Sequence, residues 1–217
     1  MNFRKSVVSG FLCFLLAACG IQMSPSKDSW YAQQYFIMQD FERTAYKSLF
    51  PAVRVEFQKL FWEVRSPASK QEFDKRLDYI ANNFKKENFK QPWNTDRARV
   101  FLLNGNPAQI DYKQNTAWAL RVVPGAGGAA VTDDRSGEDV GGNTAEVWTF
   151  RYDKFLVDYI FTFSKPNSWV LNPATFQGNR YLGALEFQNK LQTYGIVDEK
   201  QYKEKLKALK AFQEEKK

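Results

Sequence analysis

The segment AEVWTFRYDKFLVDYIFTF, residues 145–163, sets the class of fold. Residues 145–152 and 155–163 are both rich in β-branched and aromatic side chains, which favour strands. Only Asp153 and Lys154 separate the two runs, and this spacing predicts a tight antiparallel hairpin. The middle of the chain therefore contains a sheet.

The second run carries an apolar stripe, because alternate residues of a strand point to the same face. Its members are Phe155, Val157, Tyr159, Phe161 and Phe163. We interpret the stripe as the sheet face that helices cover. The alternative is an aromatic platform on which sugars stack.

The sequence before this hairpin follows a helical period. Residues 28–49 are predicted to be mostly helical, because their apolar residues recur with this period. Pro51 suits the first turn of a second helix. Ser66 and Pro67 end that helix. A capping box at residues 69–72 then predicts the start of a third helix.

Two further short runs extend the predicted sheet. Residues 99–103 are expected to form a strand that stops at a turn over 104–107, and residues 116–123 alternate as a strand does. Residues 181–217 are charged and helical in pattern. The fold is predicted as α+β, with N-terminal helices packed on an antiparallel sheet of about four strands and a charged C-terminal helix.

The N-terminus has the pattern of an export signal. Residues 1–18 combine a basic start with an apolar run that is too short to span a membrane. Leu16-Ala17-Ala18-Cys19-Gly20 resembles the lipobox of bacterial lipoproteins. The resemblance implies cleavage before Cys19, lipid on its sulfur and, because Gly20 rather than Asp follows, the outer membrane. Residues 19–27 then form a short tether.

The organisation of the remaining chain follows from these patterns. Residues 28–90 form a helical region, residues 91–180 a β region, and residues 181–217 a charged helical segment. The β region includes a Gly-rich loop over residues 124–144. Its acidic residues lack the spacing of an EF-hand, so we expect no metal site there.

The composition excludes several kinds of catalysis. The chain has no histidine, which rules out Ser-His-Asp and Cys-His mechanisms and zinc helices of the HExxH type. Residues 125–130 satisfy GxGxxA, but no helical pattern follows to hold a pyrophosphate. Glu146 and Asp158 remain as one carboxylate pair for acid–base chemistry. We expect no cofactor, and the formal net charge of +7 does not demand a nucleic acid.

Three ordered blocks resemble the GWxTD domain family of bacterial envelope proteins. They are FQKLFWEVRSP (residues 57–67), PWNTDRARVFLLNGNP (92–107) and EVWTF (146–150). Pro92 and Ala98 stand where the family pattern has glycine, and Ser66 stands where it has aspartate. The resemblance implies a fold and an envelope setting, and it brings no reaction with it.

The motif residues have a structural interpretation and a binding one. Thr95 and Asp96 can hydrogen-bond the backbone at the start of the strand at 99–103, and Arg97 or Arg99 can pair with Asp96 or Glu146. The alternative is a groove in which aromatic rings and an Arg–carboxylate pair meet a glycan or peptide. The candidate residues are Trp93, Thr95, Asp96, Arg97, Arg99, Glu146 and Trp148.

The sequence thus predicts a non-enzymatic outer-membrane lipoprotein that docks a protein partner in an envelope assembly. The alternatives are a module that binds glycan or peptidoglycan through exposed Trp and Tyr rings, and a hydrolase that uses Glu146 or Asp158. The tryptophans whose exposure would favour the glycan module are Trp93, Trp118, Trp148 and Trp169. We expect contact with the membrane through the lipid on Cys19.

Overall fold

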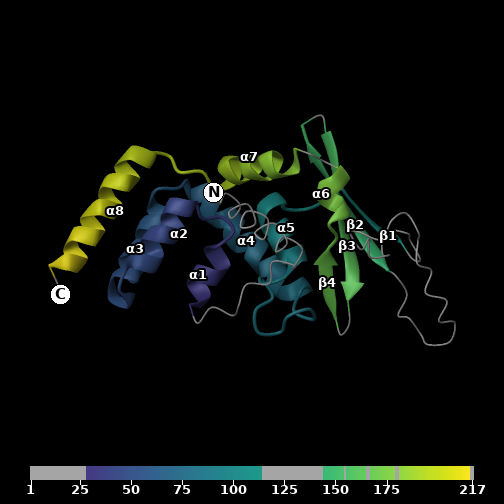
Figure 1. Cartoon of the computed structure of the whole chain (residues 1–217), viewed down its shortest axis with the longest axis horizontal. Coiled ribbons are helices and arrows are strands. Elements are labelled where there is room, and N and C mark those ends of the chain that lie inside the picture. Colours follow the sequence, from purple (N-terminus) through teal and green to yellow (C-terminus); the bar gives the residue numbers. More distant parts are fainter. Residues whose placement is uncertain (1–27, 114–143, 154, 165–166, 179–180, 216–217) are drawn as a thin grey trace, which may run out of the picture.

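The computed structural model describes residues 28–113, 144–153, 155–164, 167–178 and 181–215. Helices gather at one end of the molecule and against one face of a four-stranded antiparallel sheet at the other (Figure 1). This arrangement confirms the predicted α+β class. The elements are α1 (Ser29–Gln34), α2 (Asp40–Ser48), α3 (Pro51–Glu63), α4 (Pro67–Asn83), α5 (Asp96–Asn104), β1 (Gln109–Lys113), β2 (Ala145–Tyr152), β3 (Phe155–Ser164), β4 (Ser168–Leu171), α6 (Ala174–Gly178), α7 (Leu182–Tyr194) and α8 (Glu199–Glu214).

The first helices begin at residues that suit helix starts. Asp28 caps α1 by accepting a hydrogen bond from the Tyr31 amide at 3.0 Å, and Pro51 opens α3. The predicted helix over residues 28–49 is divided into α1 and α2. A reciprocal capping box between Gln39 and Glu42 starts α2.

The predicted start of α4 at residues 69–72 is wrong. Ser66 is the N-cap, with its hydroxyl accepting from the Ser69 amide at 3.1 Å, and Pro67 is the first helical residue. Ser66 and Pro67 therefore have two roles: they start α4, and they separate it from α3. Pro at the first position needs no amide partner, which makes this start better than the box at 69–72.

The predicted strand over residues 99–103 is also wrong, because this segment lies within α5. The Thr95 hydroxyl caps the helix by accepting from the Ala98 amide at 3.2 Å. The helix ends at Gly105, whose φ of +75° favours glycine. Its apolar run is buried on several sides of the helix, so it lacks the polar positions that reveal a helical period.

The sheet has the order β1-β2-β3-β4. The predicted hairpin is confirmed: β2 pairs with β3 from Ala145↔Thr162 to Tyr152↔Phe155, and Asp153 takes a positive φ of 50° in the turn. The sequence analysis missed β1 and β4. The predicted strand over residues 116–123, and all but the last residue of the Gly-rich loop, lie outside the described residues.

The apolar stripe of β3 faces the helices over its middle part. Val157, Tyr159 and Phe161 are 0–2% exposed, whereas Phe155 and Phe163 at the two ends are 62% and 39% exposed. The centre of the stripe is therefore part of the core, as the helix-covered interpretation predicted. Only its ends offer aromatic surface.

A fully buried ion pair joins the helices. Arg65 donates to both carboxylate oxygens of Glu42 at 2.9 Å, and both side chains are 0% exposed. The same guanidinium donates to the carbonyls of Phe61 at 2.6 Å and Tyr194 at 3.0 Å. Arg65 thereby connects α2, α3 and the end of α7.

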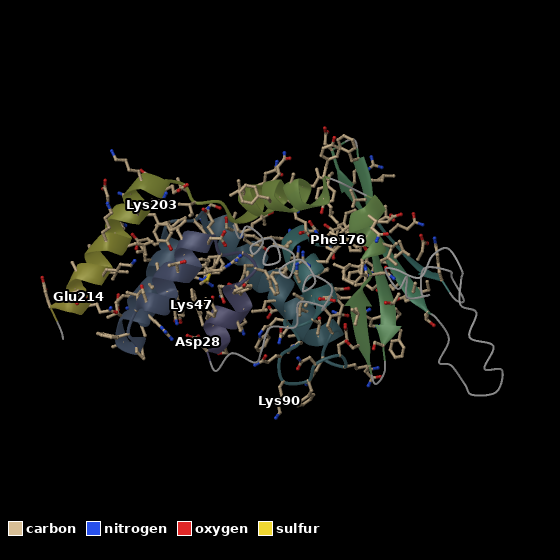
Figure 2. The ribbon with its side chains drawn as sticks, viewed as in Figure 1. Asp28, Lys47, Lys90, Phe176, Lys203 and Glu214 are labelled. Carbon is tan, nitrogen blue, oxygen red and sulfur yellow. The ribbon has the colours of Figure 1, made fainter. Side chains whose placement is uncertain are left out.

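The last helix packs against α3 at the far end of the molecule, where Figure 2 labels Lys203 and Glu214. Gln213, which is 6% exposed, accepts a hydrogen bond from the Phe50 amide at 2.6 Å and donates to the Ser48 carbonyl at 3.3 Å. These residues form the junction between α2 and α3. The charged C-terminal helix thus has a buried side.

Replacing Arg65 by Met is expected to lower the free energy of unfolding by about 3–5 kcal/mol, because Glu42 is left as an unpaired buried charge. Urea unfolding measures the loss. The double variant Glu42→Leu/Arg65→Met should lose less than the single variant, since no buried charge remains. A single variant within 1 kcal/mol of the unchanged chain would contradict this role of the pair.

Candidate functional site

Arg97 on α5 bridges two buried carboxylates. Its guanidinium donates to Glu87 in the turn after α4, with Nε at 2.8 Å and Nη2 at 2.7 Å, and to Glu146 on β2 with Nη1 at 2.9 Å. The side chains of Glu87, Glu146 and Arg97 are 2%, 3% and 13% exposed. This Arg97 cluster joins α5 and the turn after α4 to the sheet.

Aromatic rings enclose the Arg97 cluster. The guanidinium carbon lies 4.9 Å from the centroid of Phe84 and 5.1 Å from that of Trp169. The indole of Trp148 donates to Glu146, and the backbone amide of Trp169 donates to Glu87 at 3.2 Å. Glu87 is therefore held by the guanidinium and by one backbone amide, whereas Glu146 is held by the guanidinium, the Trp148 indole and the Tyr112 hydroxyl.

The cluster holds two acids and one base. Burial raises the pKa of the Glu87 carboxyl above its ordinary value, and the charge of Arg97 opposes part of that rise. The negative charge of Glu146 adds to the rise. A carboxyl with a raised pKa can act as a general acid when it can reach a substrate. Here both carboxylates are almost fully enclosed, so the arrangement favours a structural role.

The motif residues before Arg97 also serve the fold. Thr95 caps α5, and Asp96, which is 7% exposed, accepts from the Leu171 amide at 2.8 Å. The first turn of α5 is thus fastened to β4. The predicted local contact with the backbone exists for Thr95, where it caps a helix, but Asp96 bonds the distant backbone of β4 instead.

Arg99 belongs to a second polar network on another side of α5. It donates to Glu186 of α7 at 3.0 Å and 3.2 Å, and does not join the Arg97 cluster. Tyr159 also donates to Glu186, at 3.2 Å, and its hydroxyl lies 2.9 Å from that of Tyr152. Burial is the main cause that raises the pKa of Tyr152 to about 12.

Glu146 and Asp158 do not form the carboxylate pair that the sequence left open. Glu146 lies on the helix-facing side of β2 together with Trp148. Asp158 is exposed, pairs across the strands with Thr149 and accepts from its hydroxyl at 2.6 Å. Because successive residues of a strand face opposite ways, the two carboxylates lie on opposite faces of the sheet.

The tryptophans proposed as sugar-stacking rings are mostly covered. Trp148 is 3% exposed, and Trp93 and Trp169 are partly buried against the core. The indole nitrogen of Trp93 is buried without a hydrogen-bond partner. Trp118 lies outside the described residues.

Sequence analysis included Glu146 among the possible partners of Arg97, but it missed Glu87 as the second partner of Arg97 and Glu186 as the partner of Arg99. Glu87 sits among polar residues after α4, where no pattern distinguishes it from a solvated side chain. Glu186 lies on a helix with an exposed apolar residue beside it, Phe187, and that helix was predicted only as part of a charged segment. The available signal was the neighbouring pair Glu186 and Phe187, because an apolar residue on the outward side of a helix suggests that the acidic residue beside it faces inward.

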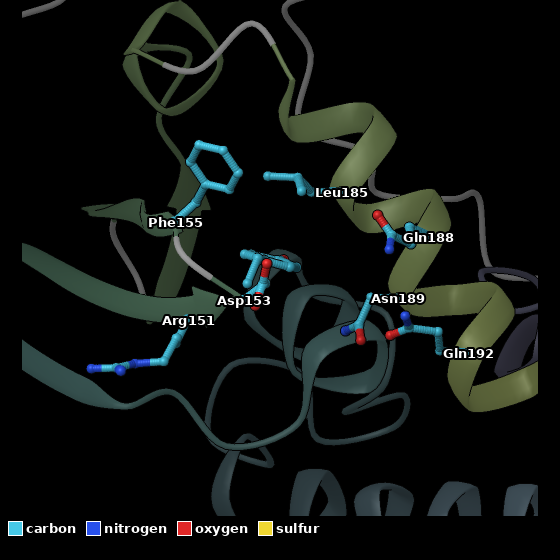
Figure 3. A pocket seen from close by; sticks show the side chains of 8 residues that line it. Arg151, Asp153, Phe155, Leu185, Gln188, Asn189 and Gln192 are labelled. Atoms are coloured by element: carbon cyan, nitrogen blue, oxygen red, sulfur yellow. The ribbon is translucent and has the colours of Figure 1, made fainter.

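A cavity of about 270 Å³ lies between the β2–β3 hairpin and α7, away from the Arg97 cluster (Figure 3). Its lining residues are Arg151, Tyr152, Asp153, Phe155, Leu185, Gln188, Asn189 and Gln192. None of the candidate residues named from the sequence is among them. Tyr152 connects the cavity wall to the network around Tyr159.

The raised pKa of Glu87 predicts a pH dependence. Protonated Glu87 stabilises the folded chain at pH values below its ordinary pKa of 4.5, and this contribution disappears as pH rises through the folded pKa. The free energy of unfolding of the unchanged chain should therefore fall relative to Glu87→Gln between pH 4 and pH 8. Urea unfolding across this range measures the difference.

The variant Glu56→Gln is the matched control, because the Glu56 side chain is 50% exposed. It should show no comparable trend. A difference that moves in favour of the unchanged chain as pH rises would indicate a lowered pKa for Glu87 and contradict the assignment.

Metal ions and membrane spans have no candidate in the described part of the chain. Its residues contain no group of three or more His, Cys, Asp or Glu that could hold a metal. None of the helices within them is long and apolar enough to cross a membrane. Compared with protein families, curated proteins and solved structures, the chain matches no family model, no curated protein and no solved structure.

Proposed function

We propose that this chain is a lipid-anchored docking or assembly component of the bacterial cell envelope, without a reaction of its own. The observation that carries the proposal is the outward face of α7, which bears no charge. Gly183, Ala184, Phe187, Gln188, Leu191 and Gln192 are all exposed there. Solvated helices normally put charged residues on this face.

The charged residues of α7 point the other way. Glu186 accepts from Arg99, and the Lys190 ammonium donates to the Met38 carbonyl at 2.6 Å. Burial and the nearby Arg43 lower the pKa of Lys190 to about 8. The helix therefore uses its charges inside the molecule and offers a neutral surface to its surroundings.

The exposed face has the composition of a protein interface. Phe187 and Leu191 are 56% and 40% exposed and lie one turn apart, so they form one apolar ridge. Interface cores are depleted of charge and enriched in aromatic residues. Covering the ridge with a partner would remove apolar area from water, at about 25 cal/mol per Å².

The anchor rests on the sequence around Cys19. The lipobox-like segment supports lipid on this cysteine, and Gly20 supports the outer membrane. Residues 21–27 reach at most roughly 25 Å, which keeps the domain near the bilayer. The GWxTD-like blocks support an envelope setting.

The alternatives receive less support from the geometry. A hydrolase that uses the two carboxylates as a pair would need Glu146 and Asp158 in one cleft, but they lie on opposite faces of the sheet. A glycan module built on tryptophans would need exposed indoles, and Trp148 is buried. The contacts of Arg97 support a structural role for the motif.

Charging the α7 ridge is expected to abolish docking. Crosslinking in intact cells through a tag after Lys217, followed by mass spectrometry, should recover a stoichiometric envelope protein with the unchanged chain. Phe187→Glu/Leu191→Glu should lose that protein, because glutamate is costly to desolvate in an apolar interface. Val55→Glu is the control, since Val55 on α3 is 49% exposed. Recovery of the unchanged chain alone would contradict the proposal.

The anchor is tested separately at its cysteine. Cys19→Ser should abolish metabolic labelling with palmitate, because Cys19 is the proposed lipid acceptor. Cys13→Ser keeps the acceptor and should label normally. Membrane association that persists without label in Cys19→Ser would argue for another anchor.

A further inference from the structure

The cavity beside α7 has three amide side chains on one wall. Gln188, Asn189 and Gln192 come from α7, while Asp153 and Phe155 come from the hairpin (Figure 3). Among the described residues, the side chains of Gln188 and Gln192 make no hydrogen bond. Each can therefore offer a donor and an acceptor to a ligand.

Hydrogen bonds to the end of α5 fix two residues of the cavity wall, Tyr152 and Asn189. Asn104 at the end of α5 accepts with its side-chain oxygen from the Tyr152 hydroxyl at 2.6 Å and from the Asn189 amide at 3.0 Å. Asn189 also donates to the Leu103 carbonyl at 2.9 Å. Its amide nitrogen is thus occupied, and its side-chain oxygen keeps acceptor capacity. A wall fixed by such bonds needs little ordering when a ligand binds.

An apolar end completes the cavity. Figure 3 shows the ring of Phe155 and the side chain of Leu185 approaching each other there, and Arg151 extending away from α7. Phe155 is 62% exposed, so its ring is accessible. Tyr152 keeps a neutral hydroxyl, since its pKa is about 12. Asp153 is the one charged group that remains beside the three amides.

We propose that this cavity binds a neutral saccharide that carries an N-acetyl group. The amides of Gln188 and Gln192 match the acetamido group and the hydroxyls, since each of these offers donors or acceptors. The ring of Phe155 matches the apolar face of a sugar, and Asp153 can accept from hydroxyls. The lining carries one charge of each sign, Arg151 and Asp153, so the cavity has no net charge and favours a ligand without one.

The size of the cavity limits the ligand. Pockets for small molecules measure about 300–1,000 Å³, and about 270 Å³ lies just below that range. The cavity therefore suits one sugar ring, or the end of a chain, more than an entire oligosaccharide. The proposal does not depend on the docking role, because the α7 ridge is formed by Phe187 and Leu191. The cavity uses Gln188 and Gln192, which lie beside that ridge on the same exposed face of α7.

The test is a titration of the full chain, solubilised in detergent, with N,N′-diacetylchitobiose. Two-dimensional NMR should show saturable shifts at the backbone amides of residues 152–155 and 185–192. Cellobiose, which has the same linkage without acetamido groups, should bind about tenfold more weakly, as expected for lost hydrogen bonds. A neutral tripeptide such as trialanine should not compete.

One variant and two controls locate the site. Gln192→Leu keeps the approximate volume but removes the amide, and should weaken binding about tenfold. Gln71→Leu on the exposed side of α4 is the matched control and should bind normally. The Phe187→Glu/Leu191→Glu chain should keep its affinity for the disaccharide, which separates this site from the docking ridge.

Four outcomes would overturn the proposal. They are equal affinity for cellobiose and the acetylated disaccharide, shifts confined to other parts of the chain, tighter binding of trialanine, and unchanged affinity in Gln192→Leu. Loss of the protein partner in the ridge variant, with disaccharide binding intact, would leave both proposals standing. Loss of disaccharide binding in the ridge variant would contradict the separation of the two sites.

Discussion

The double ion pair of Arg97 is the contact that holds helices and sheet together. Its guanidinium is shared between the turn after α4, ten residues earlier, and the second strand, 49 residues later, so three segments meet at one group. Two carboxylates and one guanidinium leave an excess of negative charge in a low-dielectric setting, which is stable only when each oxygen finds a donor. The indole of Trp148 and the amide of Trp169 meet that demand.

The sequence predicted the α+β class, the hairpin over residues 145–163 and the helices before it. The error at residues 99–103 shows where periodicity fails, because a short apolar run buried all round looks the same in a helix and in a strand. A helix and a strand over these residues would differ in the directions of the Arg97 and Arg99 side chains. A strand would send both to one face, whereas a helix turns about 200° over two residues and sends them to β2 and α7. Their partners, Glu87 and Glu186, could not be found without that geometry.

In the candidate site too, contacts between residues close in sequence could be predicted, whereas most contacts that depend on the fold could not. Residues close in sequence, such as Thr95 and its capping contact, followed from local chemistry, and the Arg97–Glu146 pair was among the predicted options. The cavity beside α7 was not predicted, because its walls come from a hairpin end and a helix that share no motif. The proposed ridge and the proposed saccharide site both use α7, on neighbouring sides. One helix would then carry two kinds of recognition without any charged side chain on its exposed face.

The two hydrogen bonds of Gln213 to the junction between α2 and α3 affect the order in which parts of the chain can fold. The amide of Phe50, which precedes the first turn of α3, has its partner 163 residues later. A chain that emerges from its N-terminus reaches this partner only after a further 163 residues have followed Phe50. Until Gln213 has been delivered, the Phe50 amide and the Ser48 carbonyl at the junction between α2 and α3 have water in place of these two hydrogen bonds.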